Sequence, residues 1–121
     1  MTVPPVPPGV NTPDLDAITR SVVGLHKELF GRGPVRARAF LSGDTLVCTL
    51  GDGFAPAERR MIEAGLSDEV RRHREVIGRV ERRRFASLVG EMTGRRVVTH
   101  LRDCDPETGN SVEVFVLDGS R

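Results

Sequence analysis

The chain has 121 residues, 38% of them hydrophobic, which is enough to bury one core without help from disulfides or a metal. Its formal net charge of +1 excludes a global field that would draw the whole molecule onto nucleic acid or an anionic membrane. Two cysteines do not make a disulfide framework, which favours a reducing cytoplasm, and the longest apolar runs fall far short of the ~20 residues of a membrane-crossing helix.

Residues 1–12 contain four prolines and are expected to form a disordered, proline-rich tail. The triplet Thr12-Pro13-Asp14 then predicts a helix start, because it supplies a cap, a first-turn proline and an acidic residue. Apolar residues follow at spacings of three and four, which predicts an amphipathic helix that ends at Gly31; they are Leu15, Ile18, Val22, Leu25 and Leu29.

Two stretches of alternating residues, 35–41 and 45–50, flank Ser42-Gly43-Asp44 and predict a β-hairpin. A short helix is expected from Pro56 to about Ala64. A second, long helix is expected from Ser67, as its cap, to Thr93, with Gly94 as the left-handed residue that ends it.

Residues 97–102 and 111–117 predict a second hairpin around a turn that contains Pro106 and Gly109. The predicted order α-β-β-α-α-β-β indicates an α+β two-layer sandwich, in which three helices cover one face of a mainly antiparallel four-stranded sheet. We expect residues 13–118 to form this single domain and residues 119–121 to be a tail, while the strand order stays open.

The long helix has charged residues where its buried apolar stripe should lie. Arg74, Glu81 and Arg84 fall within or beside the line of Val70, Ile77, Leu88 and Met92, where an unpaired charge would be costly. Ion pairing or snorkelling at the stripe edge explains this most simply. The alternative is a polar cluster or interface, which could also include Glu58 and Glu91.

The opposite side of the same helix is basic. It carries Arg72, Arg79, Arg82 and Arg83, which could meet phosphate, although a solvated face with helical ion pairs is the commoner case. A second basic group is expected on the sheet face away from the helices, formed by Arg36, Arg38, His100 and Arg102 beside Phe40.

The last strand is apolar on both sides, apart from Glu113. One side can serve the core, and the other needs cover from a second copy, from a partner or from being a central strand. Four carboxylates near the second hairpin, Asp103, Asp105, Glu107 and Glu113, match no metal-binding loop, and the three histidines lack positioned partners in the sequence. No metal, cofactor or catalytic residue is therefore predicted.

Several motifs in combination resemble the MpsC family, named for a component of a sodium-translocating membrane-potential-generating system. They are Gly31-Arg32-Gly33-Pro34, Pro56-Ala57-Glu58-Arg59, Glu91-Met92-Thr93-Gly94-Arg95 and Glu113-Val114-Phe115-Val116-Leu117. Ala55 departs from the threonine that is usual before that proline. The resemblance implies a small soluble protein that accompanies membrane subunits linked to ion or bicarbonate uptake, and it implies no catalytic residues.

The leading hypothesis is a non-enzymatic accessory domain, expected to be a homodimer, that is cytoplasmic and peripheral at the inner membrane face through a membrane-protein partner. The alternative is a nucleic-acid-binding module that uses the arginine-rich helix. A third hypothesis is a small-molecule enzyme with a pocket near Arg74 and Glu81.

Overall fold

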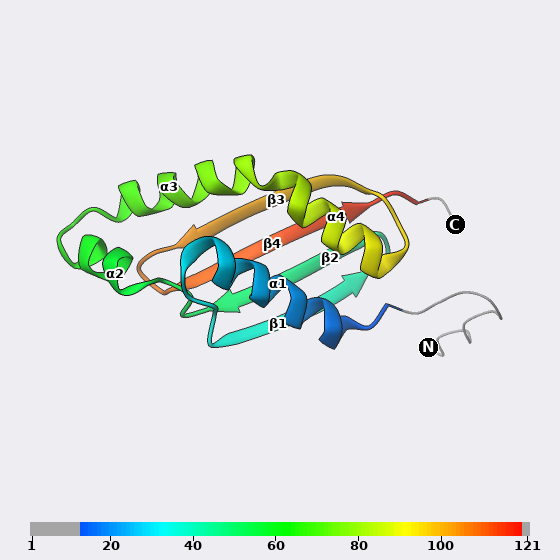
Figure 1. The fold of residues 1–121 in the computed structure, drawn as a ribbon, viewed down its shortest axis with the longest axis horizontal. Coiled ribbons are helices and arrows are strands. Elements are labelled where there is room, and N and C mark those ends of the chain that lie inside the picture. The colour runs from blue at the N-terminus through cyan, green and yellow to red at the C-terminus, as the bar shows by residue number, and fades with distance from the viewer. Residues whose placement is uncertain (1–12, 120–121) are drawn as a thin grey trace.

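The computed structural model describes residues 13–119, so the predicted tail at residues 1–12 lies outside it. The described chain forms an antiparallel four-stranded sheet with helices on one face (Figure 1). The strands are β1 (Arg36–Ser42), β2 (Thr45–Gly51), β3 (Val97–Asp105) and β4 (Asn110–Leu117), in the spatial order β1-β2-β4-β3. This confirms the predicted α+β class and makes β4 a central strand.

Helix α1 (Leu15–Phe30) begins at Asp14, whose carboxylate accepts a hydrogen bond of 3.0 Å from the backbone N–H of Ala17. It ends at Gly31, which takes the left-handed conformation with φ 78°. Its buried residues face the sheet and pack with side chains of β2, β4 and a later helix; the cluster comprises Ile18, Val22, Leu25, Leu46, Cys48, Leu50, Phe85, Val89, Phe115 and Leu117.

The predicted long helix is wrong, because the described residues form four helices rather than three. After α2 (Pro56–Glu63), α3 (Ser67–Val80) and α4 (Arg82–Thr93) are separated at Glu81, where φ −98° and ψ 13° leave the helical region. The expected cap at Ser67 is also wrong, since Leu66 holds that position without a side-chain cap.

The break has a geometric reason. A straight helix from Ser67 to Thr93 would be about 40 Å long, whereas the nine residues of β3 span about 30 Å. The bend at Glu81 lets α3 follow β3 while α4 turns across the sheet toward α1 (Figure 1). Each segment can therefore bury its own apolar side chains, Val70 on α3 and Phe85 with Val89 on α4.

The prediction that His100 and Arg102 lie on the open face of the sheet is also wrong. Both point to the helix side, with His100 7% exposed, whereas Leu101 between them is 59% exposed. A register shift between Val97 and Thr99 accompanies this change of alternation, since one extra residue moves the following side chains to the other face. Arg36, Arg38 and Phe40 are exposed on β1 as expected.

Candidate interaction surface and buried polar network

A carboxylate lies at the centre of the helix-covered face. Glu113 on β4 is 0% exposed and accepts hydrogen bonds from His26 Nε2 at 2.9 Å and His100 Nε2 at 2.6 Å. Arg102 Nη2 lies 3.2 Å from the same carboxylate. These four residues, from α1, β3 and β4, form what we call the Glu113 network, and they join the first helix to the sheet.

The charges of the Glu113 network follow from this geometry. Burial alone would raise the pKa of Glu113, but the hydrogen bonds from His100 and His26 and the charge of Arg102 outweigh it and hold the pKa at about 2. Burial lowers the pKa of His26, against the pull of Glu113, so the imidazole donates to the carboxylate while neutral. The network therefore holds the carboxylate of Glu113, the guanidinium of Arg102 and the neutral imidazole of His26, with His100 as a further hydrogen-bond donor.

A second buried ion pair connects α3 to α2. Arg74 is 3% exposed, and its Nε and Nη2 each lie 2.7 Å from an oxygen of Glu58. Its Nη2 also donates to the carbonyl of Gly53 at 2.9 Å, and the guanidinium lies 4.1 Å from the ring centre of Phe30 and 4.4 Å from that of Phe54. Glu58 also accepts from the backbone N–H of Ala55, which is one half of a capping box, while the alanine side chain cannot accept the other hydrogen bond.

The residues of the predicted polar cluster separate into different groups. Arg74 and Glu58 meet as described, whereas Arg84 lies 3.5 Å from Glu81 and 2.6 Å from Glu28 in a more exposed position. Glu91 is exposed and borders a hollow beside Arg83 and Arg84. The sequence placed these side chains near one stripe, and the structure brings only some of them together.

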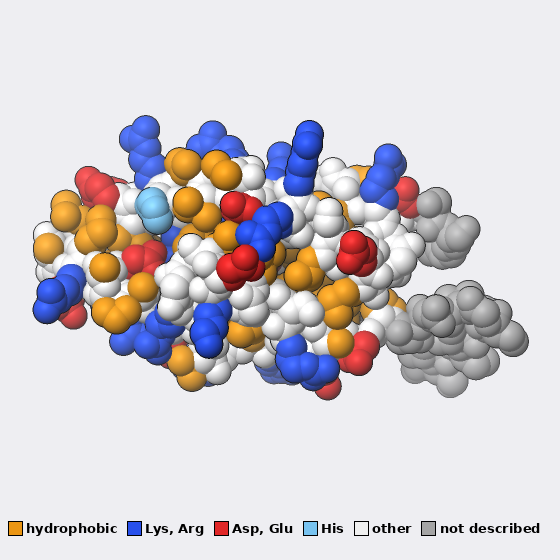
Figure 2. All heavy atoms as spheres, in the orientation of Figure 1, with side chains coloured by type: hydrophobic (Ala, Val, Ile, Leu, Met, Phe, Trp, Pro, Cys, Tyr) orange, Lys and Arg blue, Asp and Glu red, His pale blue; other side chains and the backbone are white. Residues whose placement is uncertain are grey.

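The predicted basic surface lies along the outside of α3 and α4. Arg72, Arg79, Arg82 and Arg83 are all exposed, and Figure 2 shows Lys and Arg side chains projecting along this rim. Arg79 lies 3.7 Å from Glu75, and Arg82 Nη2 donates to the carbonyl of His100 at 3.4 Å. At least two of the four arginines thus already contact acceptors of the same chain.

The face of the sheet away from the helices carries an apolar row across its middle, next to a row that includes Thr49 and Asp103. Cross-strand pairing aligns Phe40, Val47, Val114 and Leu101 in one row across all four strands. Phe40 is 44% and Leu101 59% exposed, and the valines between them are partly exposed. We call this the outer sheet face; it comprises Phe40, Val47, Leu101, Val112, Val114 and Val116.

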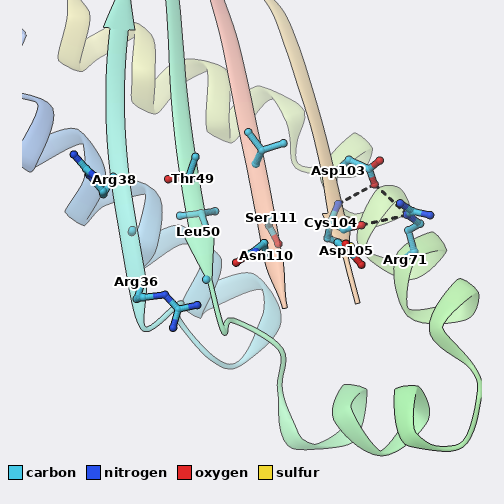
Figure 3. A pocket seen from close by; sticks show the side chains of 13 residues that line it. Arg36, Arg38, Thr49, Leu50, Arg71, Asp103, Cys104, Asp105, Asn110 and Ser111 are labelled. Carbon is cyan, nitrogen blue, oxygen red and sulfur yellow. Dashed lines mark hydrogen bonds and ion pairs between the residues drawn. The ribbon is translucent and has the colours of Figure 1, made fainter. Parts of the chain in front are cut away.

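A trough of about 600 Å³ crosses one end of the outer sheet face (Figure 3). Arg36 and Arg38 of β1 line one side of the trough. Asp103 and Asp105 of β3 line the other, where Arg71 of α3 donates to Asp103 at 3.2 Å. The trough is therefore positively charged at its β1 side and carries carboxylates at its β3 side.

Sequence reasoning missed the Glu113 network. It grouped Glu113 with the turn carboxylates, although Asp103 contacts Arg71 and Asp105 accepts from the backbone N–H of Glu107. The alternation along β4 could have predicted its burial. Glu113 lies two and four residues before Phe115 and Leu117, so it points to the same face of the sheet, and both of those residues are buried. Within residues 13–119, no three His, Cys, Asp or Glu side chains are placed to hold a metal ion.

These features define an α+β domain with one open sheet face, and no helix in its described part is long and apolar enough to cross a membrane. The chain belongs to the MpsC family, described as Na+-translocating membrane potential-generating system (MpsC), which it matches over residues 15–119. Comparisons with curated proteins and with solved structures gave no match.

Proposed function

We propose that this protein is a non-enzymatic accessory domain of a Na+-translocating membrane potential-generating system and that it binds a membrane subunit of that system through the outer sheet face. The observation that carries the proposal is the apolar row from Phe40 to Leu101 on a face that no described helix covers. Contiguous exposed apolar surface typically marks a protein contact.

The flanking charges support a protein partner. The trough carries arginines on one bank and aspartates on the other, within reach of the apolar row. Protein interfaces commonly surround an apolar centre with a polar rim that fixes orientation. A partner segment with charges of both signs would fit this arrangement.

The interior supports a structural role for the charged residues. Arg74 bonds Glu58, and Glu113 bonds two histidines and Arg102, so most of these buried polar atoms have partners within the chain. Nη1 of Arg102 is buried without a hydrogen-bond partner among the described residues. Arg74 lines a hollow of about 410 Å³ with Arg71 and Arg102, but Glu81 is not among its lining residues and faces Arg84 instead. The geometry therefore does not join Arg74 and Glu81 in one pocket.

Binding to the purified membrane subunits of the same system, in detergent, tests the proposal. Val114→Lys places a charge in the middle of the outer sheet face and should abolish co-purification. Val76→Lys is the matched control, because Val76 is 42% exposed on α3, on the helix side of the molecule. Equal binding by both variants, or no binding by the unmodified protein, would contradict the proposal.

The second candidate function is nucleic-acid binding through Arg72, Arg79, Arg82 and Arg83, which share the rim of α3 and α4. Counterion release then requires affinity to fall steeply with salt, with a log–log slope of about −0.9 for each phosphate contacted on duplex DNA. Gel shifts at several salt concentrations distinguish the two candidates, since docking through an apolar face depends far less on salt.

A further inference from the structure

The two edges of the sheet are treated differently by the rest of the chain. At β3, side chains from the helices contact the outward backbone carbonyls. Arg82 Nη2 donates to His100 O at 3.4 Å, and Arg71 Nε donates to Cys104 O at 3.2 Å. Helices α3 and α4 also pack beside this strand. The β3 edge is thus occupied.

The β1 strand is packed against α1 on its helix side, but within residues 13–119 its outward backbone groups have no such side-chain contacts. Its hydrogen-bonded neighbour is β2 alone, and no side chain of the described residues bonds its backbone. An edge strand leaves every second residue with an unpaired N–H and C=O, ready to pair with another strand. At seven residues, β1 is long enough to offer a row of such groups.

The sequence of β1 is complementary to itself in one antiparallel register. With Ala39 opposite Ala39 of a second copy, all seven residues overlap and Ala37 faces Leu41 on the helix side. On the other side Arg38 faces Phe40, an attractive pairing already formed within one chain, where Arg38 lies 5.0 Å from the Phe40 ring centre. Moving the centre to Arg38 would instead oppose two like charges.

We propose that β1 pairs antiparallel with β1 of a second copy of this chain, centred on Ala39, so that two domains share one continuous sheet. The pairing satisfies the outward backbone groups of β1 in both copies. It also places the two outer sheet faces side by side on one surface. The proposal does not depend on the proposed function, because a dimer can form through this edge whatever the outer sheet face binds.

Disulfide trapping in the full chain tests both the pairing and its register. Residues opposite each other in an antiparallel pair have Cα atoms about 5 Å apart, which a disulfide can bridge. Ala39→Cys should therefore cross-link to itself under mild oxidation. Ser42→Cys, on the same strand, would lie about 20 Å from its own copy and should not.

The two native cysteines should not interfere with the cross-linking assay. Cys48 and Cys104 are both buried. Burial, helped by the charge of Glu113, raises the pKa of Cys48 to about 12, and burial raises the pKa of Cys104 as well. The double variant Arg36→Cys with Ser42→Cys is the positive control. It should cross-link, because these two positions face each other across the proposed interface.

Sedimentation equilibrium of the unmodified chain should give twice the monomer mass of 13.3 kDa. Val114→Lys should leave that mass unchanged, so loss of partner binding and loss of the dimer are separately visible. A monomeric mass throughout the micromolar range would overturn the proposal. A dimer that Val114→Lys dissociates, or that cross-links equally through Ser42→Cys, would overturn it as well.

Discussion

At the scale of single residues, the most consequential side chain is Glu113. A fully buried carboxylate is costly unless donors surround it, and here three side chains from two other elements do so. His26 comes from α1, whereas His100 and Arg102 come from β3. The carboxylate therefore specifies how α1 sits on the sheet as well as balancing the charge of Arg102.

Glu113→Gln should destabilise the fold by about 3 kcal/mol, because it leaves Arg102 without its buried counter-charge. The amide also presents N–H donors where only acceptors fit, against the two imidazole N–H groups. Urea unfolding at neutral pH measures the loss. Glu107→Gln in the exposed turn is the control and should change the free energy of unfolding by less than about 0.5 kcal/mol.

Stability should fall as the pH decreases below 6.5, the ordinary pKa of a histidine such as His26. Because the folded pKa of His26 is lowered, the unfolded chain binds the proton first, so its contribution is present above pH 6.5 and is lost below it. Glu113 adds a further loss only below 4.5, the ordinary pKa of a glutamate, and toward its folded pKa of about 2. Denaturation midpoints between pH 8 and pH 5 measure the slope.

His26→Gln serves as the matched variant, because its amide keeps an N–H donor for Glu113 but does not titrate. It should flatten the part of the slope that His26 causes. His73→Gln makes the same substitution at an exposed histidine of α3, outside the Glu113 network, and serves as the control. A midpoint that stays constant from pH 8 to pH 5 in the unmodified protein would rule out the neutral, buried imidazole.

At the scale of elements, glycine and arginine together decide how closely α3 approaches β3. Gly78 is buried on α3, and a Cβ at that position would lie 2.5 Å from Cδ and Nη1 of Arg102. Arg102 cannot easily move away, since it is held by Glu113 and lies beside the rings of Phe30 and Phe85. Close packing here therefore requires a residue without a side chain.

Gly78→Ala should destabilise the protein by about 1–2 kcal/mol through this overlap, although alanine is the better helix former. Gly24→Ala in α1 is the matched control, because a Cβ there meets no atom within 4 Å. That substitution should stabilise the protein by about 0.5–1 kcal/mol. Thermal unfolding of both variants gives the comparison, and two changes of the same sign would refute the packing argument.

Helix α2 is held to α3 by the Arg74–Glu58 pair. Arg74→Met should cost about 3 kcal/mol, because Glu58 and the carbonyl of Gly53 lose their buried donor. Hydrogen exchange should show the loss concentrated in α2. Arg72→Met, on the exposed side of α3, is the control, and adding Glu58→Gln to Arg74→Met should recover part of the stability.

At the scale of the whole molecule, the described helices cover one face of the sheet and leave the other face open. Arginine side chains contact the backbone at the β3 edge, whereas the β1 edge is open. The open face carries the proposed partner site, and the open edge carries the proposed dimer. The two surfaces meet at β1, where Phe40 belongs to both. Dimerisation would thus enlarge the surface that a membrane subunit could contact.

The unfolding temperature should rise with protein concentration, because a dimer that dissociates on unfolding is stabilised by mass action. Differential scanning calorimetry over a wide concentration range measures the shift. Ala39→Cys, once oxidised, should remove the concentration dependence, since the two copies are then joined. A midpoint independent of concentration in the unmodified chain would argue for a folded monomer.

The sequence by itself determined the elements that local patterns specify. Alternation gave both hairpins, the three-and-four spacing gave α1, and Gly31 and Gly94 marked two helix ends that the structure shares. These features depend on neighbours within a few residues, which is why the α+β class and the family resemblance could be inferred without a structure.

Only the tertiary structure decided the break at Glu81, the side of the sheet taken by His100 and Arg102, and the partners of Glu113. The break depends on how long the sheet is, and the sidedness depends on a register shift near Val98. Glu113 meets His26 across 87 positions of the chain. Such contacts arise when separate elements are packed together, so no local pattern could specify them.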